Sequence, residues 1–343
     1  MPTSPPLIVN VAYGAQPNSF FEPHLRGVTR WRQFEAGEPF ASPFLKRLGS
    51  SRLRRYRACY LAARCAAREG AAIVVSHDPQ VTYLTERFLR HFGYRGKHLA
   101  FSFNYPKLPT GLTRKLHARA YRTVDRFVIY STMERELYGR YFGIPLEKLQ
   151  MIHWAVNPPP VEPEGPAIDG DYVCAIGGNG RDYATLIEAA RRLPAVHFVL
   201  VVRPHSLSGL DVPQNVTAAT NLPLPRAMNL LKFSRFMVLP LIGSDVPCGH
   251  VTIVHAMHLG KAMAITRSSG VSDYVREGKN ALACAAGSVE ELTAIIRRLW
   301  DDAALRERLG ASGREMAQTC CSEARTLAYF RGVLAEWGAI GAS

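Results

Sequence analysis

The sequence has no cysteine pattern of the kind that builds disulfide frameworks or zinc sites. Its seven cysteines are an odd number, no two of them have C-x-x-C spacing, and Cys320 and Cys321 are adjacent. Small secreted domains instead carry an even set of spaced cysteines. We therefore expect free thiols and a reducing compartment.

Long apolar runs are also lacking, and we expect no leader segment. No stretch approaches the roughly 20 apolar residues of a membrane span. The first residues, MPTSPPLIVNVAYG, have no basic segment ahead of their short apolar run. The overall apolar content of 47% is nevertheless enough for extensive cores. These features predict a soluble, cytoplasmic protein.

Acidic residues are scarce in the first half of the chain. Residues 1–160 hold 24 lysine and arginine residues and 10 aspartate and glutamate residues, whereas residues 161–343 hold 18 of each. The whole formal net charge of +14 therefore sits in the first half. This asymmetry favours an anionic partner, which is a membrane surface, a phosphorylated acceptor or nucleic acid.

Apolar runs of strand length alternate with helix-length segments along the chain. In the first half these runs cover residues 7–13, 71–77, 97–103, 126–130 and 149–154. Ser131 and Glu134 form a capping box that begins one helix, and Gly143 ends it. The second half repeats the alternation. We therefore predict an α/β fold built from βαβ units with parallel sheets.

Two domains are expected, because the segment VNPPPVEPEGP (156–166) holds five prolines and little apolar character. We predict a linker at 159–168, a Rossmann-like domain at 1–158 and a second Rossmann-like domain at 169–343. The last helix is a candidate to pack back on the first domain.

A glycine-rich turn follows the first strand of the second half. The segment AIGGNGRDYATLIEAARRLP places Gly178 in the turn and Arg181 at the entrance of the next helix. Backbone N–H groups in such a turn can approach a phosphate, and the helix N-terminus favours its charge. An ordinary strand–helix turn with a surface arginine also fits this pattern, because G-G-x-G is a weak motif.

A second turn of this kind precedes the helix in LPLIGSDVPCGHVTIVHAMHLGKAMAIT. Its loop contains Asp245, and the backbone of the helix start is predicted to face a ligand at Gly249, His250, Val251 and Thr252. His255 lies one turn further along the helix, and Lys261 follows its end. A lone histidine on an apolar helix is also compatible with a simple core position. We assign that plainer interpretation to His258.

These segments, in this order, resemble the retaining GT-B glycosyltransferases of group 1, which carry an E-x7-E signature. The resemblance covers about residues 171–335, and a weaker one covers residues 124–159. It implies two Rossmann-like α/β/α domains with parallel sheets facing a central cleft. It also implies that the second domain binds a nucleotide-diphosphate sugar, of UDP or GDP type, and that the first binds the acceptor.

The sequence departs from the family at both glutamates. His255 stands where the ribose-binding glutamate is expected, and Pro247 stands where the sugar-binding one is expected. We therefore assign ribose binding to His255, and we assign to Asp245 a catalytic role in contact with the donor sugar. The family's pair of phosphate-binding cations is reduced to Arg181, so Arg203 and Lys261 are proposed as further diphosphate ligands. The small acceptor loop of the family is replaced by YGAQPNSF, which begins near Gly14.

The first half offers fewer candidates. In the family, a histidine of the N-terminal domain contacts the donor sugar near the reacting carbon, and His77, at the end of a strand, is the candidate for this catalytic role. A histidine that merely caps a strand end is an equally good interpretation. Asn104 and Lys107, which follow the next strand, are assigned to the acceptor side, although a plain loop also fits them.

A basic helix is predicted within residues 42–70. Leu53, Tyr56, Tyr60, Ala63 and Ala67 have helical spacing, so we expect them to form its buried stripe. The outer face then carries Arg52, Arg54, Arg55 and Arg57, which we assign to an anionic membrane surface. A solvated basic face is the alternative. Nucleic acid is disfavoured, because aromatic residues needed for base stacking would point inward.

We expect a glycosyltransferase that moves a hexose to a glycan or lipid-linked acceptor in polysaccharide biosynthesis, with retention and without a cofactor. The alternative is an inactive GT-B scaffold that binds a partner. The motif DGD (169–171) resembles a metal-binding D-x-D, but it begins a strand next to the linker. No carboxylates accompany the predicted phosphate site, so we predict metal-independent transfer.

Overall fold

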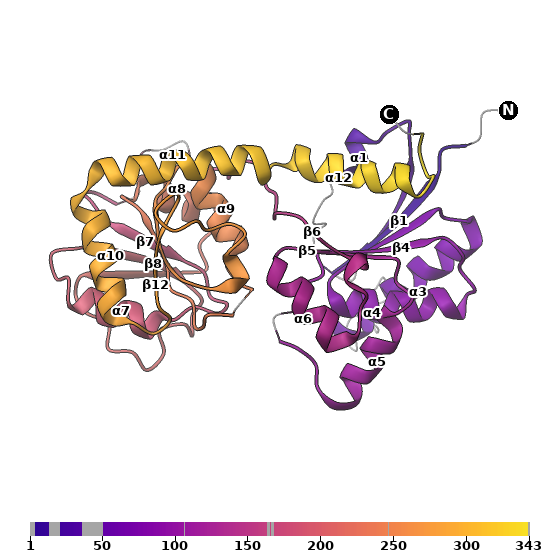
Figure 1. Cartoon of the computed structure of the whole chain (residues 1–343), viewed down its shortest axis with the longest axis horizontal. Coiled ribbons are helices and arrows are strands. Elements are labelled where there is room, and N and C mark those ends of the chain that lie inside the picture. The colour runs from indigo at the N-terminus through magenta and orange to yellow at the C-terminus, as the bar shows by residue number, and fades with distance from the viewer. Residues whose placement is uncertain are drawn as a thin grey trace, which may run out of the picture. The chain divides into compact units, whose positions relative to one another are not determined.

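The computed structural model describes residues 4–13, 21–35, 51–105, 107–162, 165, 168–245 and 247–341. It divides into two compact units (Figure 1). The first comprises Met1–Ile152 with Leu327–Ser343, and the second comprises His153–Thr326. The division falls ahead of the proline-rich segment that we predicted as the linker, and Gly14 lies outside the described residues.

The first unit contains a six-stranded sheet in the order β2-β1-β3-β4-β5-β6. All of its strand pairs are parallel. Its strands are β1 (Leu7–Ala12), β2 (Arg30–Glu35), β3 (Ile73–His77), β4 (Lys97–Phe101), β5 (Arg126–Ile129) and β6 (Leu149–Met151). Its helices are α1 (Phe21–His24), α3 (Ser51–Glu69), α4 (Pro79–His91), α5 (Gly111–Tyr121), α6 (Thr132–Phe142) and the 3-10 helix η1 (Leu146–Lys148).

Alternation along the strands divides the core of this unit into two faces. Leu7, Val9 and Val11 of β1 pack with the small residues of α3 and with α4 on one face. Ile8 points the other way, into a cluster that includes Phe21 of α1 and Phe330 near the C-terminus. Both faces of a parallel sheet must be covered, which explains why β1 is apolar at every position but Asn10.

The second unit contains another parallel six-stranded sheet, in the order β12-β11-β10-β7-β8-β9. Its strands are β7 (Val173–Ile176), β8 (Phe198–Val202), β9 (Val216–Thr220), β10 (Met237–Leu239), β11 (Met263–Thr266) and β12 (Leu282–Cys284). Its helices are α7 (Tyr183–Arg191), α8 (Leu224–Phe233), α9 (His250–His258), η2 (Ser269–Val271), α10 (Val289–Asp301) and α11 (Ala303–Cys320). Helix α12 (Glu323–Glu336) begins in this unit, and from Leu327 onward it belongs to the first. The α/β architecture with two parallel sheets is therefore confirmed.

Local signals explain where several helices begin and end. Ser131 accepts a hydrogen bond from the Glu134 N–H at the start of α6, and Gly143 ends the helix in the left-handed conformation, as predicted. Residues 327–336 of α12 pack on the first unit, where Phe330 stacks on Phe21. Among the described residues, no helix is long and apolar enough to cross a bilayer.

Chain order reverses at one place in each sheet, and this position matters for function. In the second sheet the chain runs outward from β7 to β9 and then returns to β10, on the other side of β7. In the first sheet the corresponding reversal lies between β1 and β3. Open α/β sheets bind ligands beyond the carboxyl ends of the strands at such switch points.

Candidate active site

The switch point of the second unit is formed by two turns that are tied together. Arg181 and Leu241 form an isolated antiparallel bridge, and the Ile242 N–H donates to the carbonyl of Gly180. The glycine-rich turn after β7 is therefore fixed against the loop that leads from β10 to α9. Both turns lie at the carboxyl end of the sheet.

The glycine-rich turn is shaped around an arginine. Gly177 has a φ of +126°, and a Cβ atom there would lie 2.8 Å from Nη2 of Arg181. Arg203, which follows β8, packs in the same way across Gly178, where a Cβ would lie 2.5 Å from its Cγ. Two cationic side chains from adjacent strand ends therefore fill the space that these glycines leave open.

Arg181 is held by neutral groups alone. It donates to the carbonyl oxygens of Asn179 (2.8 Å) and Ile176 (3.4 Å) and to the Thr252 hydroxyl (3.4 Å). Burial lowers the pKa of its guanidinium, and within the described residues no carboxylate forms an ion pair with it. A largely desolvated cation without a counter-charge is costly, and an anionic ligand would remove that cost.

The N-terminus of α9 meets the same place. Gly249 is the N-cap residue, with a φ of +101°, and it lies close to the Arg181 guanidinium. A glycine has no side chain that can cap the first turn, so the N–H groups of that turn remain available to a ligand. They add the positive end of the helix dipole to the charge of Arg181.

Two predicted residues of this first turn differ in what they offer. Val251 is exposed, whereas the His250 ring is buried, shares a hydrogen bond with the carbonyl of Gly270 (2.7 Å) and lies against the Tyr274 ring. Burial lowers the pKa of His250, so its imidazole is neutral. His250 therefore contributes its backbone N–H and not a cationic side chain.

We call this group the Arg181 cluster; it comprises Gly177, Gly178, Arg181, Arg203, Gly249 and Thr252. Sequence analysis selected every member except Gly177, which the doubled glycine in GGNGR already signalled. The arrangement combines one half-buried guanidinium, one exposed guanidinium and a free helix N-terminus. This is the chemistry that binds a phosphate or diphosphate.

His255 lies one helical turn beyond Thr252, with 6% of its surface exposed. Burial, with a smaller effect from His258, lowers its pKa to about 4, so the ring is neutral near pH 7. No hydrogen bond to its ring is found within the described part of the chain. His258, which we interpreted as a core residue, is only half-buried and shares a hydrogen bond with the carbonyl of Val156 (2.9 Å).

Lys261, which we predicted to bind the diphosphate, lies apart from this cluster. It follows the C-terminal end of α9, about 13 Å along the helix from Gly249 at 1.5 Å per residue. Its ammonium group donates to the carbonyl of Ser234 (2.5 Å), and burial lowers its pKa to about 8. Asp245 lies exposed in the turn before α9, and within the described residues the hydrogen bonds of Arg181 go to other groups.

In the first unit, His77 lies at the end of β3, beside the switch point. It is 3% exposed, and its Nε2 shares a hydrogen bond of 2.9 Å with Oδ1 of Asn10 on β1. Burial lowers its pKa to about 3, so the ring is neutral. Since the Asn10 oxygen only accepts, Nε2 carries the proton, and Nδ1 is a buried acceptor without a partner among the described residues.

A pocket of about 760 Å³ opens in the first unit beside the start of α4. Lys107, Arg52 and Arg55 supply its positive charge, and Asp78 supplies a carboxylate. Asp78 accepts hydrogen bonds from the N–H groups of Gln80 and Val81, so it already caps α4. The aromatic residues that line the pocket include Tyr56, Tyr83 and Tyr105.

Two sequence assignments around this pocket need correction, and a third is compatible with the structure. Arg55 does not face outward, because it is half-buried, donates to the Gln80 side chain and stacks over Tyr13. Asn104 turns away from the pocket, since its amide donates to the buried carboxylate of Glu134 (2.7 Å). Lys107 is exposed on the pocket wall, as a ligand-binding role requires.

The predicted buried stripe of α3 is wrong at most of its positions, although Ala63 is buried as expected. The buried residues are Ala58, Cys59, Ala62, Ala63 and Ala66, because small side chains let α3 approach the sheet closely. Leu53 and Tyr56 are about half exposed instead. Tyr56 therefore does not point inward, and that argument against nucleic acid fails. Arg52 and Arg57 are exposed as expected, and Arg54 is half-buried.

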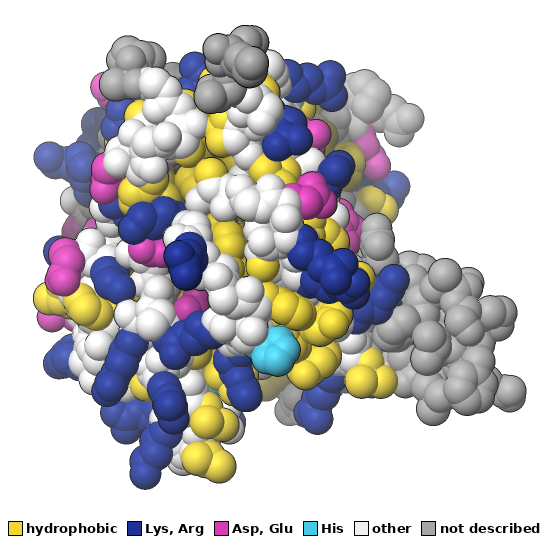
Figure 2. All heavy atoms as spheres, turned by 90° about the vertical axis from the view of Figure 1, so that its right-hand side faces the viewer, with side chains coloured by type: hydrophobic (Ala, Val, Ile, Leu, Met, Phe, Trp, Pro, Cys, Tyr) yellow, Lys and Arg dark blue, Asp and Glu magenta, His cyan; other side chains and the backbone are white. Residues whose placement is uncertain are grey.

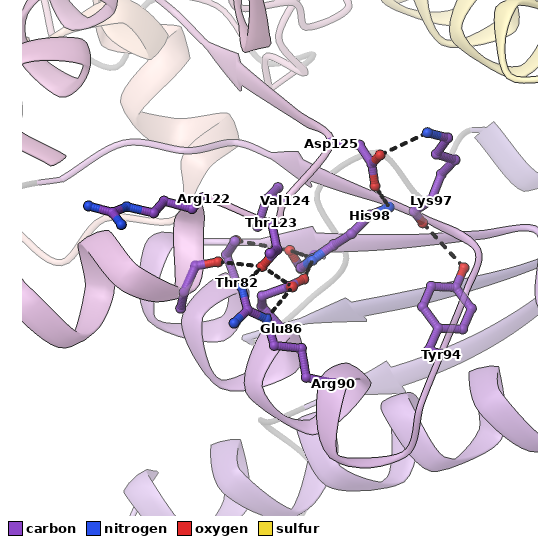
Figure 3. Close-up of polar contacts among 12 residues, drawn as sticks. Thr82, Glu86, Arg90, Tyr94, Lys97, His98, Arg122, Thr123, Val124 and Asp125 are labelled. Carbon is purple, nitrogen blue, oxygen red and sulfur yellow. Dashed lines mark hydrogen bonds and ion pairs between the residues drawn. The ribbon is translucent and has the colours of Figure 1, made fainter. Parts of the chain in front are cut away.

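A buried polar network that sequence analysis missed crosses the first unit (Figure 3). Ser76 shares a hydrogen bond with His98 Nε2 (2.8 Å), and His98 Nδ1 shares one with Glu86 (2.6 Å). This is the order of a serine–histidine–acid triad. All three residues are at most 4% exposed, and Ser76 also shares a hydrogen bond with Thr82, so no substrate can reach the serine. We therefore interpret the network as structural.

Within the described residues, no three His, Cys, Asp or Glu side chains gather in a way that could hold a metal ion. The DGD motif accords with this, since Asp171 pairs with Arg235. Metal-independent transfer remains a prediction.

Two doubly wound parallel sheets are the architecture of the GT-B class of glycosyltransferases. Residues 172–302 match the family described as "Glycosyl transferases group 1". The chain is thus a glycosyltransferase, and its second unit carries the group 1 domain together with the Arg181 cluster. No curated protein sequence matches the chain significantly.

Solved structures share the fold over nearly the whole chain. A glycosyltransferase from Rickettsia africae has 13% identity and a TM-score of 0.73, over 98% of this chain and 99% of that one. Sucrose-phosphate synthase from Thermosynechococcus elongatus has 14% identity and a TM-score of 0.72, with coverages of 97% and 99%. Anabaena Alr3699/HepE in complex with UDP and glucose has 13% identity and a TM-score of 0.71, with coverages of 96% and 99%. At these identities the likeness establishes the fold.

Proposed function

We propose that the protein transfers a sugar from a nucleotide-diphosphate sugar, of UDP or GDP type, to a glycan or lipid-linked acceptor, with retention of configuration and without a metal. The donor diphosphate lies in the Arg181 cluster, and the acceptor lies in the first unit. Polysaccharide or glycolipid biosynthesis is the setting that such an acceptor implies.

One observation carries this proposal: Arg181 is a half-buried cation with no carboxylate partner in the described structure, placed at the N-terminus of α9. A positive charge that serves only stability is normally paired when it is taken out of water. The unpaired charge, the uncapped helix and Arg203 together provide the field that a diphosphate requires. A structural neighbour, Anabaena Alr3699/HepE, is in complex with UDP-glucose, which supports a nucleotide sugar as the donor.

The transfer itself needs no nucleophile from the protein in this proposal. The bond between the anomeric carbon and the β-phosphate oxygen breaks, and a bond from that carbon to the acceptor oxygen forms. The proton of the acceptor hydroxyl passes to the departing phosphate oxygen. Arg181 and the helix dipole stabilise the negative charge that develops on the diphosphate. His77 is the residue of the first unit that we assign to the donor sugar, and this role requires its buried Nδ1 to become accessible when the donor binds.

The pocket of the first unit supports an anionic acceptor. Lys107, Arg52 and Arg55 contribute cationic groups, and the tyrosines contribute apolar surface beside them. A sugar or phosphate linked to a lipid presents both kinds of group. The exposed Arg52 and Arg57 extend the basic surface along α3, which supports peripheral contact of a cytoplasmic protein with an anionic membrane.

The alternative function is an inactive GT-B scaffold. It is favoured by Pro247 and the neutral His255, which stand where the family has carboxylates. The two functions differ in whether a donor is bound and turned over.

A donor panel separates these functions. UDP-, GDP- and ADP-sugars are tested by thermal shift and then by titration calorimetry, and each ligand that binds is assayed for hydrolysis and transfer. We expect one nucleotide class to raise the melting temperature of the wild type but not of Arg181→Ala. Arg297→Ala, which removes an exposed arginine of α10, is the matched control. If no nucleotide sugar binds, the proposed transferase function is overturned. If a nucleotide sugar binds but is neither hydrolysed nor transferred, the inactive scaffold is the function that remains.

A further inference from the structure

Helix α5 exposes aliphatic side chains that its own unit does not cover. Leu112 is 71% exposed and Leu116 is 41% exposed, and they lie four residues apart on one face of the helix. A single exposed leucine is ordinary, but two neighbouring leucines on one face form the apolar edge of an interaction surface.

The same helix has no acidic residue. Its sequence, GLTRKLHARAY, places Lys115 and Arg119 next to the two leucines, and both are exposed. Figure 2 shows lysine and arginine side chains gathered on the lower part of the first unit, at the level of α5 in Figure 1, with hydrophobic side chains between them. Exposed leucines framed by basic residues are typical of helices that lie in the interface of an anionic membrane.

A cationic pocket lies beside these leucines, between α4 and α5. It has a volume of about 330 Å³, and its lining is Tyr83, Arg87, Arg90, Leu116, Arg119 and Ala120. None of the lining residues is acidic. A phosphate group fits this chemistry, since planar guanidinium groups bind its oxygens in pairs.

The charges in this pocket are unequal. Arg90 is already engaged, because it pairs with the buried Glu86 and donates to Thr123. Arg87 donates to the Tyr83 hydroxyl, which carries no charge (2.8 Å). Arg119 makes no hydrogen bond or ion pair with the other described residues. Two guanidinium charges therefore remain uncompensated, which suits one phosphate group.

We propose that the face formed by Leu112, Leu116 and the pocket of Arg87 and Arg119 docks on an anionic phospholipid. The lipid phosphate lies in the pocket, and the two leucines insert at the boundary between headgroups and acyl chains. This inference deepens the peripheral membrane contact of the proposed function and rests on it. The aliphatic character of the exposed residues favours lipid over nucleic acid, because leucine cannot stack on a base as an aromatic ring does.

Vesicle flotation with the full chain tests the proposal. The vesicles are phosphatidylcholine alone and phosphatidylcholine with a fifth of phosphatidic acid. The test variant is Arg87→Ala with Arg119→Ala, and the matched control is Arg135→Ala with Arg140→Ala, two exposed arginines of α6 in the same unit. A third variant, Leu112→Ser with Leu116→Ser, tests insertion. Melting temperatures confirm that each variant is folded.

The expected result is selective. Arg87→Ala with Arg119→Ala weakens binding to anionic vesicles about 10- to 30-fold, and the α6 control weakens it less than about threefold, because lipid attraction contributes about 1 kcal/mol per basic residue near the surface. The leucine variant still binds anionic vesicles at low salt, but it loses the vesicle binding that remains at high salt, because that binding comes from insertion of the leucines. If both arginine variants lose the same vesicle affinity, the attraction is spread over the basic surface, and the assignment of the lipid phosphate to the pocket is overturned.

Two further outcomes separate this inference from the function on which it rests. If the wild type ignores anionic vesicles at low salt, the membrane contact itself is wrong, whatever the donor panel shows. Inorganic phosphate serves as the probe for a soluble ligand. If it binds in an Arg119-dependent way while vesicles are ignored, the pocket takes a free phosphate compound, and the lipid assignment is overturned.

Discussion

A Cβ atom on Gly177 would lie 2.8 Å from Nη2 of Arg181, so the position of this guanidinium depends on the absence of a side chain four residues earlier in the same turn. The φ of +126° at Gly177 adds a second constraint, since residues with a Cβ rarely adopt it. Turn and arginine form one unit, and the cluster should respond to a change at either.

Gly177→Ala should therefore displace Arg181 and also strain the backbone. We expect a loss of about 1–3 kcal/mol in stability and a clear loss of donor affinity. Gly287→Ala is the matched control, because Gly287 also has a positive φ, of +72°, but nothing lies within 4 Å of its Cβ position. Thermal melts and nucleotide titrations measure both. If the two variants lose donor affinity equally, backbone strain alone explains the effect, and the close packing of Arg181 on Gly177 does not position the guanidinium for the donor.

Arg181→Ala should weaken nucleoside diphosphate binding about 10- to 100-fold, because a charge-assisted hydrogen bond to a partly buried anion is lost. The stability of the free protein should change little, since the arginine has no carboxylate partner in the described structure. Calorimetric titration against the Arg297→Ala control measures the difference. Unchanged affinity in a folded variant would remove Arg181 from the site.

Treatment with a chelator tests whether the transfer reaction needs a metal ion. Transfer should continue in excess EDTA, because the positive field at the diphosphate comes from Arg181, Arg203 and the first turn of α9. The measurement is the initial rate before and after dialysis against the chelator. A rate that disappears and returns with Mg²⁺ or Mn²⁺ would assign the diphosphate to a metal ion instead.

Glu86 should make acid stability depend on one buried carboxylate. Burial alone would raise its pKa, but hydrogen bonding and attraction from His98, with hydrogen bonds from Thr123 and Arg90, lower it below the ordinary 4.5. The ionised form is thus favoured by folding, so its contribution is complete above about pH 4.5 and is lost as the pH falls through the folded-state pKa.

Glu86→Gln should cost about 3 kcal/mol at pH 7, because His98 and Arg90 lose their partner. The difference from wild type should shrink as the pH falls below 4.5. Denaturant unfolding at several pH values measures it, with Glu147→Gln, an exposed acid of the same unit, as the control. A difference that stays constant down to pH 3 would show that Glu86 is not the titrating group.

Much of the donor side could be predicted from the sequence, because its signals are local. A glycine-rich turn after a strand and a glycine before a helix specify backbone geometry within a few residues, and Arg181, Gly178 and Gly249 accordingly lie together. Lys261 shows the limit. It is adjacent to the motif in sequence, but α9 carries it to the other end of the helix.

The first unit was harder because its important contacts are distant in sequence. The bond between His98 and Glu86 joins a strand to the preceding helix, and nothing in either segment signals the partner. On α3, periodicity alone could not decide between two faces, since alanines and tyrosines both recur at helical spacing. Close packing against the sheet selected the alanines. β2 was missed because its exposed, charged residues lack the pattern of a buried strand.

His255 decides whether the donor site is altered or merely retained in outline. The buried, neutral ring lies one turn from Thr252, and its pKa of about 4 keeps it uncharged from about pH 5 upward. A neutral imidazole can form one hydrogen bond to a ribose hydroxyl as donor or acceptor at each nitrogen. Donor affinity should therefore show no titration from His255 between pH 5.5 and 8. Stability should fall as the pH drops below about 6.5, because the unfolded state then binds the proton.

His255→Ala should raise the donor KM several-fold with a smaller effect on kcat, which is the pattern for an interaction made equally in the ground and transition states. His255→Glu restores the residue that the family resemblance implies, so it should recover part of the donor affinity even though burying a carboxylate costs stability. Melting temperature and donor affinity, measured on both variants, separate the two roles. If His255 binds the ribose, His255→Ala lowers donor affinity, and His255→Glu keeps more of that affinity than His255→Ala does. A core residue lowers the melting temperature in both and leaves affinity unchanged, and that result would remove His255 from the site and favour the inactive scaffold.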